Sequence, residues 1–265
     1  METANITKKR IEKYLSEGKR FDERKPEEFR DIIIETGVSK KAEGSARVKI
    51  GKTEVIVGVK LGVAEPYPDS PDKGNLMTTA ELTPLSSERI SLGRPGIDSI
   101  ELGRVIDRGI RESKFIELEK LCIKEGEKVW NVFIDIYSIN DDGNLLDAAG
   151  IGAVIALKEA HIPKYDEKED KILYEEESKE KLPLSKNITF PVTVHKVGND
   201  FLVDPTREEE DIVKSRVTIG MNKEGIASMQ KGKEGSLSVE EFDKVLDIAE
   251  KAWAEVFKKI EKHIK

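Results

Sequence analysis

The sequence predicts an α+β fold made of two similar halves, each a mixed β-sheet with helices packed on one face. In both halves, segments that alternate apolar and polar residues precede segments whose apolar residues recur every three or four positions. Strand runs followed by helices are typical of layered α+β packing. An almost wholly charged stretch, residues 164–181, separates the two sets, and no sequence repeat is obvious.

Composition limits the kinds of protein that this chain can be. Its 265 residues suffice for one large or two small domains. The formal net charge of -7 excludes a polycation that binds nucleic acid indiscriminately, so any RNA contact needs a local basic patch or a partner that supplies positive charge. The lone Cys122 excludes an intrachain disulfide and a cysteine metal site. Without a signal peptide or a bilayer-spanning apolar run, we expect a cytoplasmic protein with no membrane contact.

The first half is expected to follow an N-terminal helix and charged arm, residues 1–31. Within the arm, residues 6–17 predict a helix that stops at Gly18. The half itself spans 32–163. Its long helix is expected to begin at Asp98, capped by Glu101, and to run to about Glu119. The other expected elements are strands at 32–35, 46–50, 53–61 and 129–139, a two-residue turn at Gly51-Lys52, loops at 65–76 and 84–97, and a small-residue helix at 146–160.

Residues 164–187 are expected to form an exposed charged linker, and residues 188–265 the C-terminal half. Ser238 and Glu241 have the spacing of a capping box, and an apolar stripe from Phe242 to Ile260 predicts a long amphipathic helix behind it. The strands expected before that helix are 188–197, 201–203, 216–221 and 225–230.

A row of arginines marks one face of the long helix in the first half. Arg104, Arg108 and Arg111 lie at i, i+4 and i+7, opposite an apolar face, and Arg94 in the preceding loop extends the row. Guanidinium groups suit phosphate oxygens, so the row is a candidate phosphate-binding surface. The alternative is a solvated surface on which these arginines pair with Glu101, Asp107 and Glu112.

No familiar hydrolytic site is present in the sequence. None of the three histidines stands in a motif with Ser or Cys, and there is no paired-His zinc motif, P-loop or dinucleotide fingerprint. Two acidic segments, 141–142 and 208–211, have the ligand types for a divalent cation, but a turn and a solvated charge run are the more ordinary explanations of them. We therefore assign no catalytic residue, metal or cofactor.

Six segments, taken in their order and spacing, form a recognisable set. They are Phe21-Asp22-Glu23-Arg24 with Phe29-Arg30, Glu43 to Val48, Gly51 to Val55, Glu101-Leu102-Gly103-Arg104 with Arg108, Asp142 to Ala149, and Val203-Asp204-Pro205-Thr206 with Glu208-Glu209. This set resembles the RNase PH superfamily, and within it the non-catalytic RNase PH-like subunit of the archaeal exosome. The resemblance covers nearly the whole chain and implies an RNase PH-like fold for both halves.

The sequence departs from active members of that family at two places. Such members hold the attacking phosphate in a Gly-Gly-Thr-Arg-type turn, whose place is taken here by Asn144, Leu145, Leu146 and Asp147. Leucine offers no side-chain donor, and we expect Asp147 to repel phosphate. Active members also carry an acidic residue in a later strand, where Arg216 stands in this chain. The resemblance therefore implies a catalytically silent chain.

By resemblance, such a subunit pairs with a catalytic RNase PH-like homologue, and three pairs close a hexameric 3′-to-5′ RNA-degrading ring with an RNA-binding cap. It helps to structure its partner and lends basic side chains to single-stranded RNA, a role that the arginine row fits. Two alternatives stay open. The chain can be an active phosphate-dependent 3′-to-5′ exoribonuclease in its own right, or a free-standing RNA-binding or structural protein.

Overall fold

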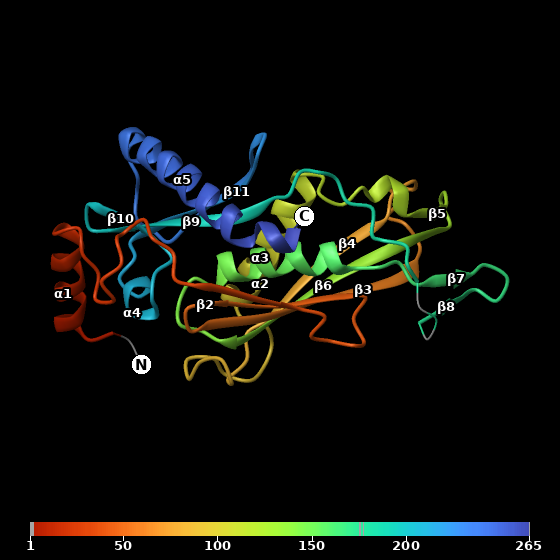
Figure 1. Cartoon of the computed structure of the whole chain (residues 1–265), viewed down its shortest axis with the longest axis horizontal. Coiled ribbons are helices and arrows are strands. Elements are labelled where there is room, and N and C mark those ends of the chain that lie inside the picture. The colour runs from red at the N-terminus through yellow and green to blue at the C-terminus, as the bar shows by residue number, and fades with distance from the viewer. Residues whose placement is uncertain (1–2, 175, 177, 265) are drawn as a thin grey trace.

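The computed structural model describes residues 3–174, 176 and 178–264. Residues 1–2, 175, 177 and 265, which belong to the predicted arm, linker and C-terminal half, lie outside the described part. Figure 1 shows an elongated molecule whose N-terminal helix α1 (Asn5–Ser16) stands at one end and whose small β7–β8 hairpin (Lys164–Asp166 and Lys171–Leu173) stands at the other. The hairpin lies within the segment that we expected to be a plain linker.

The larger sheet is mixed and belongs to the first half. Its strands run in the order β1-β2-β3-β6-β4, with β5 paired to β6. Only β4 is parallel to its neighbour, and the other pairs are antiparallel. Alternation buries every second residue of β3 from Thr53 to Leu61, including Val55, Val57 and Val59. The bounds are β1 (Ile32–Thr36), β2 (Gly44–Ile50), β3 (Thr53–Ala64), β4 (Asn75–Glu81), β5 (Cys122–Lys124) and β6 (Lys128–Asn140).

The smaller sheet belongs to the C-terminal half, and its described strand pairs are antiparallel. A four-residue helix, α4 (Arg207–Glu210), lies between its second and third strands in the chain, and the long helix α5 (Val239–Ile264) follows the last strand. Ser238 and Glu241 exchange the two hydrogen bonds of the expected capping box at the start of α5. The strands, in spatial order, are β10 (Asp200–Val203), β9 (Phe190–Val197), β11 (Ser215–Asn222) and β12 (Gly225–Gly232).

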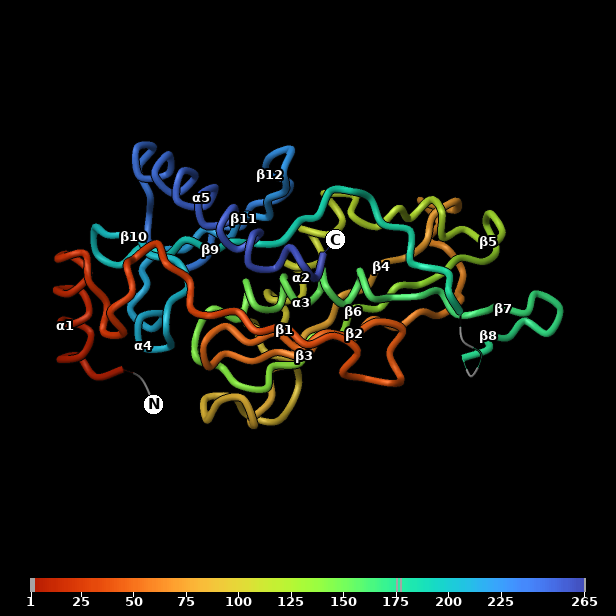
Figure 2. Tube along the Cα trace, viewed as in Figure 1, coloured from red at the N-terminus to blue at the C-terminus, as the bar shows by residue number. Residues whose placement is uncertain are grey.

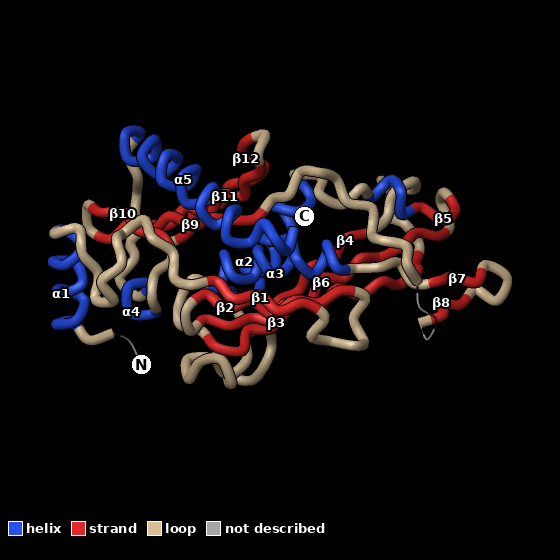
Figure 3. Tube along the Cα trace, viewed as in Figure 1, coloured by secondary structure: helices blue, strands red, loops and turns tan. Residues whose placement is uncertain are grey.

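Helices α2 (Ile97–Glu112) and α3 (Leu145–Glu159) lie between the two sheets, as Figure 3 shows. Helix α3 contacts strands of both sheets, so its residues from Asp147 to Leu157 are buried. Its glycines allow the close approach: a Cβ at Gly150 would lie 2.0 Å from the Pro191 ring, and one at Gly152 2.7 Å from Val57. The predicted small-residue helix is therefore confirmed, and it joins the two halves through one continuous core.

Helix α1 packs on the C-terminal half, although it begins the chain. Ile11 and Leu15 share a small apolar cluster with Val197, Leu202, Ile212 and Val213, apart from the main core. Figure 2 shows this end of the chain beside α4 and β10. The first and last thirds of the sequence thus meet there.

Three local expectations were wrong. Strand β4 was not predicted, and the expected loop at 65–76 ends where this strand begins. Helix α2 ends at Glu112, because Lys114 has a φ of 51° and the chain turns to bury Phe115. The N-cap of α2 is Gly96 and not Asp98, so no side chain at the N-cap position accepts a hydrogen bond from the first turn.

Candidate functional site

A cavity of about 250 Å³ lies where the beginnings of α2 and α3 approach β11. It brings together positions that are far apart in the sequence: Leu145 and Leu146 at the start of α3, and Arg216 on β11. All three belong to positions singled out from the sequence. The other residues that line it are Leu82, Ser87, Arg89, Ile90, Asp98, Glu101, Leu102, Asp141, Arg207, Glu210 and Lys233.

The arginines of this cavity are neutralised from within the chain. Arg216 Nη2 lies 2.6 Å from Glu101 Oε2, and Arg207 Nη1 lies 3.1 Å from Asp141 Oδ2. Arg89 donates to both carboxylate oxygens of Asp211, at 2.6 and 2.9 Å. The four cationic side chains of the wall stand against four carboxylates, so the cavity has little net charge to attract an anion.

The N-cap and first turn of α3, residues 144–147, have two residues that do not line the cavity. Asn144 is in the left-handed conformation, with a φ of 64°, and its Nδ2 donates to Asp204 Oδ1 at 2.8 Å. Asp147 is fully buried and accepts hydrogen bonds from Thr193 N at 3.2 Å and Thr193 Oγ1 at 2.7 Å. The expectation that Asp147 repels an incoming phosphate is therefore wrong, because its carboxylate points into the core.

Burial also shifts the pKa values of two residues near the cavity, Asp147 and His195. It raises the pKa of Asp147 to about 7, against the opposing effect of the Thr193 hydrogen bonds. Burial, and then the nearby charge of Arg216, lower the pKa of His195 to about 3. Both ring nitrogens of His195 lack a hydrogen-bond partner among the described residues. His195 is therefore a neutral core residue, and it does not line the cavity as a base.

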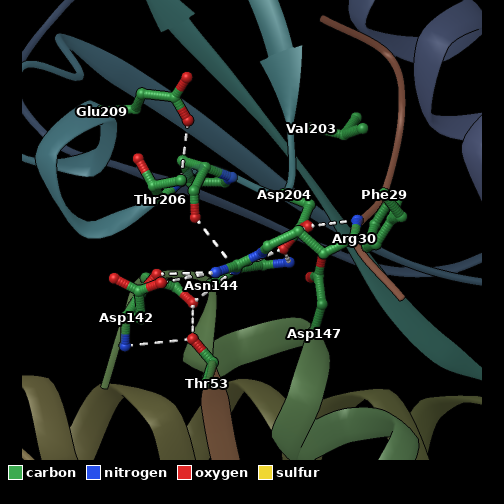
Figure 4. Close-up of polar contacts among 12 residues, drawn as sticks. Phe29, Arg30, Thr53, Asp142, Asn144, Asp147, Val203, Asp204, Thr206 and Glu209 are labelled. Carbon is green, nitrogen blue, oxygen red and sulfur yellow. Dashed lines mark hydrogen bonds and ion pairs between the residues drawn. The ribbon is translucent and has the colours of Figure 1, made fainter. Parts of the chain in front are cut away.

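A buried ionic network supports the same turn from behind (Figure 4). Arg30 holds the Asp204 carboxylate with Nε–Oδ2 and Nη2–Oδ1 distances of 2.8 and 2.7 Å, and it also donates to the Asp142 and Gly143 carbonyls. Arg20 donates to both carboxylate oxygens of Glu209 in the same bidentate way, and it also donates to the Asp204 carbonyl. The predicted charged arm thus anchors the turn through buried arginines.

This network pairs one carboxylate of each acidic segment with an arginine of the same chain, Asp142 with Arg30 and Glu209 with Arg20. Burial alone would raise the pKa of Asp204, but the hydrogen bonds and charge of Arg30 outweigh it and hold the pKa below its ordinary value. Glu209, which we considered part of a solvated charge run, is buried against Arg20. No cluster of potential metal ligands was found among the described residues. The sequence signal for this network was the Asp204-Pro205-Thr206 segment with Glu209 three residues on.

The arginine row is only partly available to a ligand. Arg104, Arg108 and Arg111 are exposed on α2, and Arg94 is exposed in the loop before it. Arg111 is tied to Asp107 Oδ2 at 3.0 Å and to the Leu76 carbonyl at 3.0 Å. Arg108 donates to Gln230 Oε1 at 3.0 Å, a neutral partner.

Arg104 and Arg94 have no hydrogen bond or ion pair within the part of the chain that the structure describes. Arg104 and Arg108 line a groove of about 480 Å³ with Ile97, Ile100 and Gln230. This groove adjoins the cavity through Glu101, which lines both. Of the pairings that the solvated alternative required, only that of Arg111 with Asp107 is found among the described residues.

No described helix is long and apolar enough to cross a membrane.

Comparison with known proteins gives a consistent result. Residues 28–163 match the first domain, and residues 187–252 the second domain, of the 3′ exoribonuclease family (RNase PH). The chain is 46% identical over 245 residues to the protein named exosome complex component Rrp42 of Methanothermobacter thermautotrophicus, covering 92% of this chain and 90% of that one. It is 48% identical over 249 residues to the protein of the same name from Thermococcus gammatolerans, covering 93% and 90%.

Solved structures agree with the family match. A chain of the Archaeoglobus fulgidus exosome with RNA bound to the active site superposes with a TM-score of 0.89 at 41% identity, covering 97% of this chain and 98% of that one. A chain of an archaeal exosome core gives 0.84 at 40% identity, covering 97% of each. With both domains matched and relatives this similar over nearly its full length, the chain belongs to the 3′ exoribonuclease (RNase PH) family.

Proposed function

We propose that this chain is a non-catalytic subunit of an exosome-type, 3′-to-5′ RNA-degrading assembly. The observation that supports it most directly is the composition of the 250 Å³ cavity. Leu145 and Leu146 supply apolar side chains at the first turn of α3, where a bound phosphate would need donors. The names of the relatives point the same way, since they are exosome components.

The charge pattern of the cavity argues against phosphorolysis at this site. An attacking phosphate and an RNA phosphodiester are both anions, so a site that joins them needs unpaired cations or amide donors. Here Arg216, Arg207 and Arg89 are already paired to carboxylates of the same chain. At position 216 a guanidinium, which stays charged at working pH, cannot serve as an acid or a metal ligand.

The proposed contribution to RNA handling is made by the groove on α2. Arg104 and Arg108 present two exposed guanidinium groups one helical turn apart, free of carboxylate partners among the described residues, and exposed Arg94 precedes them. They suit consecutive phosphates of single-stranded RNA. Arg111 contributes less, because Asp107 neutralises it.

We also propose that the chain works together with other protein subunits. A silent subunit has a function only beside an active one, so we expect it to pair with a catalytic homologue in a ring of alternating chains that also carries RNA-binding cap subunits. A solved relative is described as an exosome with RNA bound to the active site. A mass measurement on the chain co-expressed with a catalytic homologue tests this point. A roughly six-chain species is expected, and a persistent monomer would favour a free-standing protein.

The catalytic question is tested on the purified chain alone. Labelled single-stranded RNA is incubated with inorganic phosphate, and release of nucleoside diphosphates is followed. No release above background is expected from the isolated chain, and release is expected once the catalytic homologue is added. Phosphate-dependent release by the chain alone would establish the alternative, an active exoribonuclease.

A further inference from the structure

A second basic surface, remote from α2 in the sequence, surrounds the N-terminal helix. Residues 5–25 carry eight Lys and Arg against four Asp and Glu, in a chain whose net charge is -7. In the structure, residues between 13 and 25 of this segment line a hollow of about 640 Å³ between the end of α1 and the arm that follows. Figure 1 shows α1 at the end of the molecule, away from α2.

The helix end creates this hollow by turning the chain back on itself. Gly18 adopts a φ of 70°, and the N–H groups of Gly18 and Lys19 donate to the carbonyls of Leu15 and Tyr14, at 2.8 and 2.9 Å. This is the Schellman pattern, which needs a residue such as glycine in the left-handed region. Arg20 then anchors the returning chain, with its buried guanidinium bound to Glu209.

The reversal brings two aromatic rings together at the edge of the hollow. Phe21 and Tyr14 meet edge to face, with centroids 5.1 Å apart and planes at 80°. The Arg10 guanidinium lies 5.5 Å from both ring centroids. Phe21 remains 43% exposed, so part of its ring surface is open to a ligand.

Unpaired cations surround these rings. Arg10, Lys13 and Lys25 are exposed, and none has a carboxylate within ion-pairing distance among residues 3–174, 176 and 178–264. The hollow also holds carboxylates, those of Glu17 and Glu23, and Glu17 pairs only loosely with Lys19, at 3.6 Å. Positive charge therefore predominates around the hollow.

The lining favours a nucleic acid over a protein partner. None of the described residues that line the hollow is Leu, Ile, Val or Met, so the aliphatic anchors of a protein interface core are missing. An exposed ring beside ammonium and guanidinium groups that have no carboxylate partner within the described part of the chain is instead the combination that holds single-stranded RNA, through base stacking and phosphate contacts.

We propose that this N-terminal hollow is a second binding site for single-stranded RNA, separate from the groove on α2. A nucleobase stacks on Phe21, and Lys13, Lys25 and Arg10 hold the phosphates on either side of it. Because stacking tolerates any base, the site has little sequence preference.

The test uses the full-length chain with Arg104→Ala and Arg108→Ala, so that the α2 groove does not dominate. Fluorescence anisotropy measures binding of a labelled oligoadenylate and of an abasic ribose-phosphate oligomer of equal length. Phe21→Leu keeps the apolar bulk without a π-face and is expected to weaken oligoadenylate binding about tenfold, while Phe21→Trp retains it. Binding of the abasic oligomer is expected to be the same for both variants.

Charge reversal completes the test. Lys13→Glu with Lys25→Glu is expected to weaken both oligomers, whereas the matched control Lys251→Glu, an exposed lysine of α5, leaves both unchanged. Thermal unfolding of each variant establishes that the fold is intact. Unchanged oligoadenylate affinity in folded Phe21→Leu and Lys13→Glu/Lys25→Glu chains would overturn the proposal. The proposal that the α2 groove binds RNA is tested separately, by measuring RNA binding when Arg104 and Arg108 alone are changed.

Discussion

The Glu101 carboxylate of α2 lies 2.6 Å from the guanidinium of Arg216 on β11, across the cavity between the two halves of the molecule. Arg216 is only 8% exposed, so its charge depends on this partner. The pair joins the arginine-bearing helix to the strand position where active relatives are expected to carry an acid. This ion pair therefore bridges the first half and the C-terminal half at the cavity.

Removing the carboxylate is expected to destabilise the protein. Glu101→Gln leaves the Arg216 charge uncompensated, at a cost of about 1–3 kcal/mol, below the full value for a buried pair because Glu101 is 31% exposed at its side chain. Chemical denaturation measures the free energy of unfolding. Glu112→Gln is the control, an exposed residue of the same helix without an ion pair among the described residues, and it is expected to change stability by less than about 0.5 kcal/mol. Equal effects would contradict the assigned role of the pair.

Asp147 predicts a specific pH dependence of stability. Its pKa rises from 3.8 in the unfolded chain to about 7 in the folded one, so the folded state binds the proton more tightly. The stabilisation is complete below pH 3.8 and is lost as the pH rises to about 7. The unfolding free energy of wild type minus that of Asp147→Asn is therefore expected to fall across this window. If the difference in unfolding free energy between the two proteins did not change with pH, burial would not raise the pKa of the Asp147 carboxylate.

The groove on α2 predicts unequal effects for its arginines. Arg104→Glu and Arg108→Glu are expected to weaken single-stranded RNA binding by the assembled ring about tenfold or more at low salt, and to reduce its salt dependence, without preventing assembly. Arg111→Glu is expected to do less, since Asp107 already neutralises that side chain. RNA affinity at low salt that is unchanged in Arg108→Glu would show that the basic face does not contact RNA.

Restoring an acid at position 216 is not expected to restore catalysis. In Arg216→Asp the new carboxylate would face Glu101, and Leu145 and Leu146 would still offer no side-chain donor to phosphate. Phosphate-dependent nucleoside diphosphate release from the isolated variant is the measurement. Appreciable release would mean that the turn at 144–147 retains more phosphate binding than its side chains indicate.

Local patterns predicted most of the fold. The apolar stripe of α5, its Ser238 cap and the Gly51-Lys52 turn depend on neighbours within a few residues, and each was found where it was expected. Strand β4 was missed because its outer residues, such as Thr79 and Glu81, are polar and its pairing to β6 is a parallel crossover contact. The expected end of α2 failed because tertiary burial of Phe115 overrode helix propensity.

The site was harder to predict because its contacts are long-range. The spacing of Asp98 and Glu101 suggests a cap, yet Glu101 pairs with Arg216, far along the chain. Asp147 points inward only because Thr193 of β9 accommodates it. The row of arginines was placed correctly on one face, but the neighbour that neutralises Arg111 decides which of them remain free.

The central claim, that this chain performs no phosphorolysis by itself, is tested most directly with the purified polypeptide, single-stranded RNA and inorganic phosphate. The claim predicts that the RNA keeps its full length and that no nucleoside diphosphate forms until a catalytic homologue is added. Shortening of the RNA by the lone chain, dependent on phosphate, would contradict it.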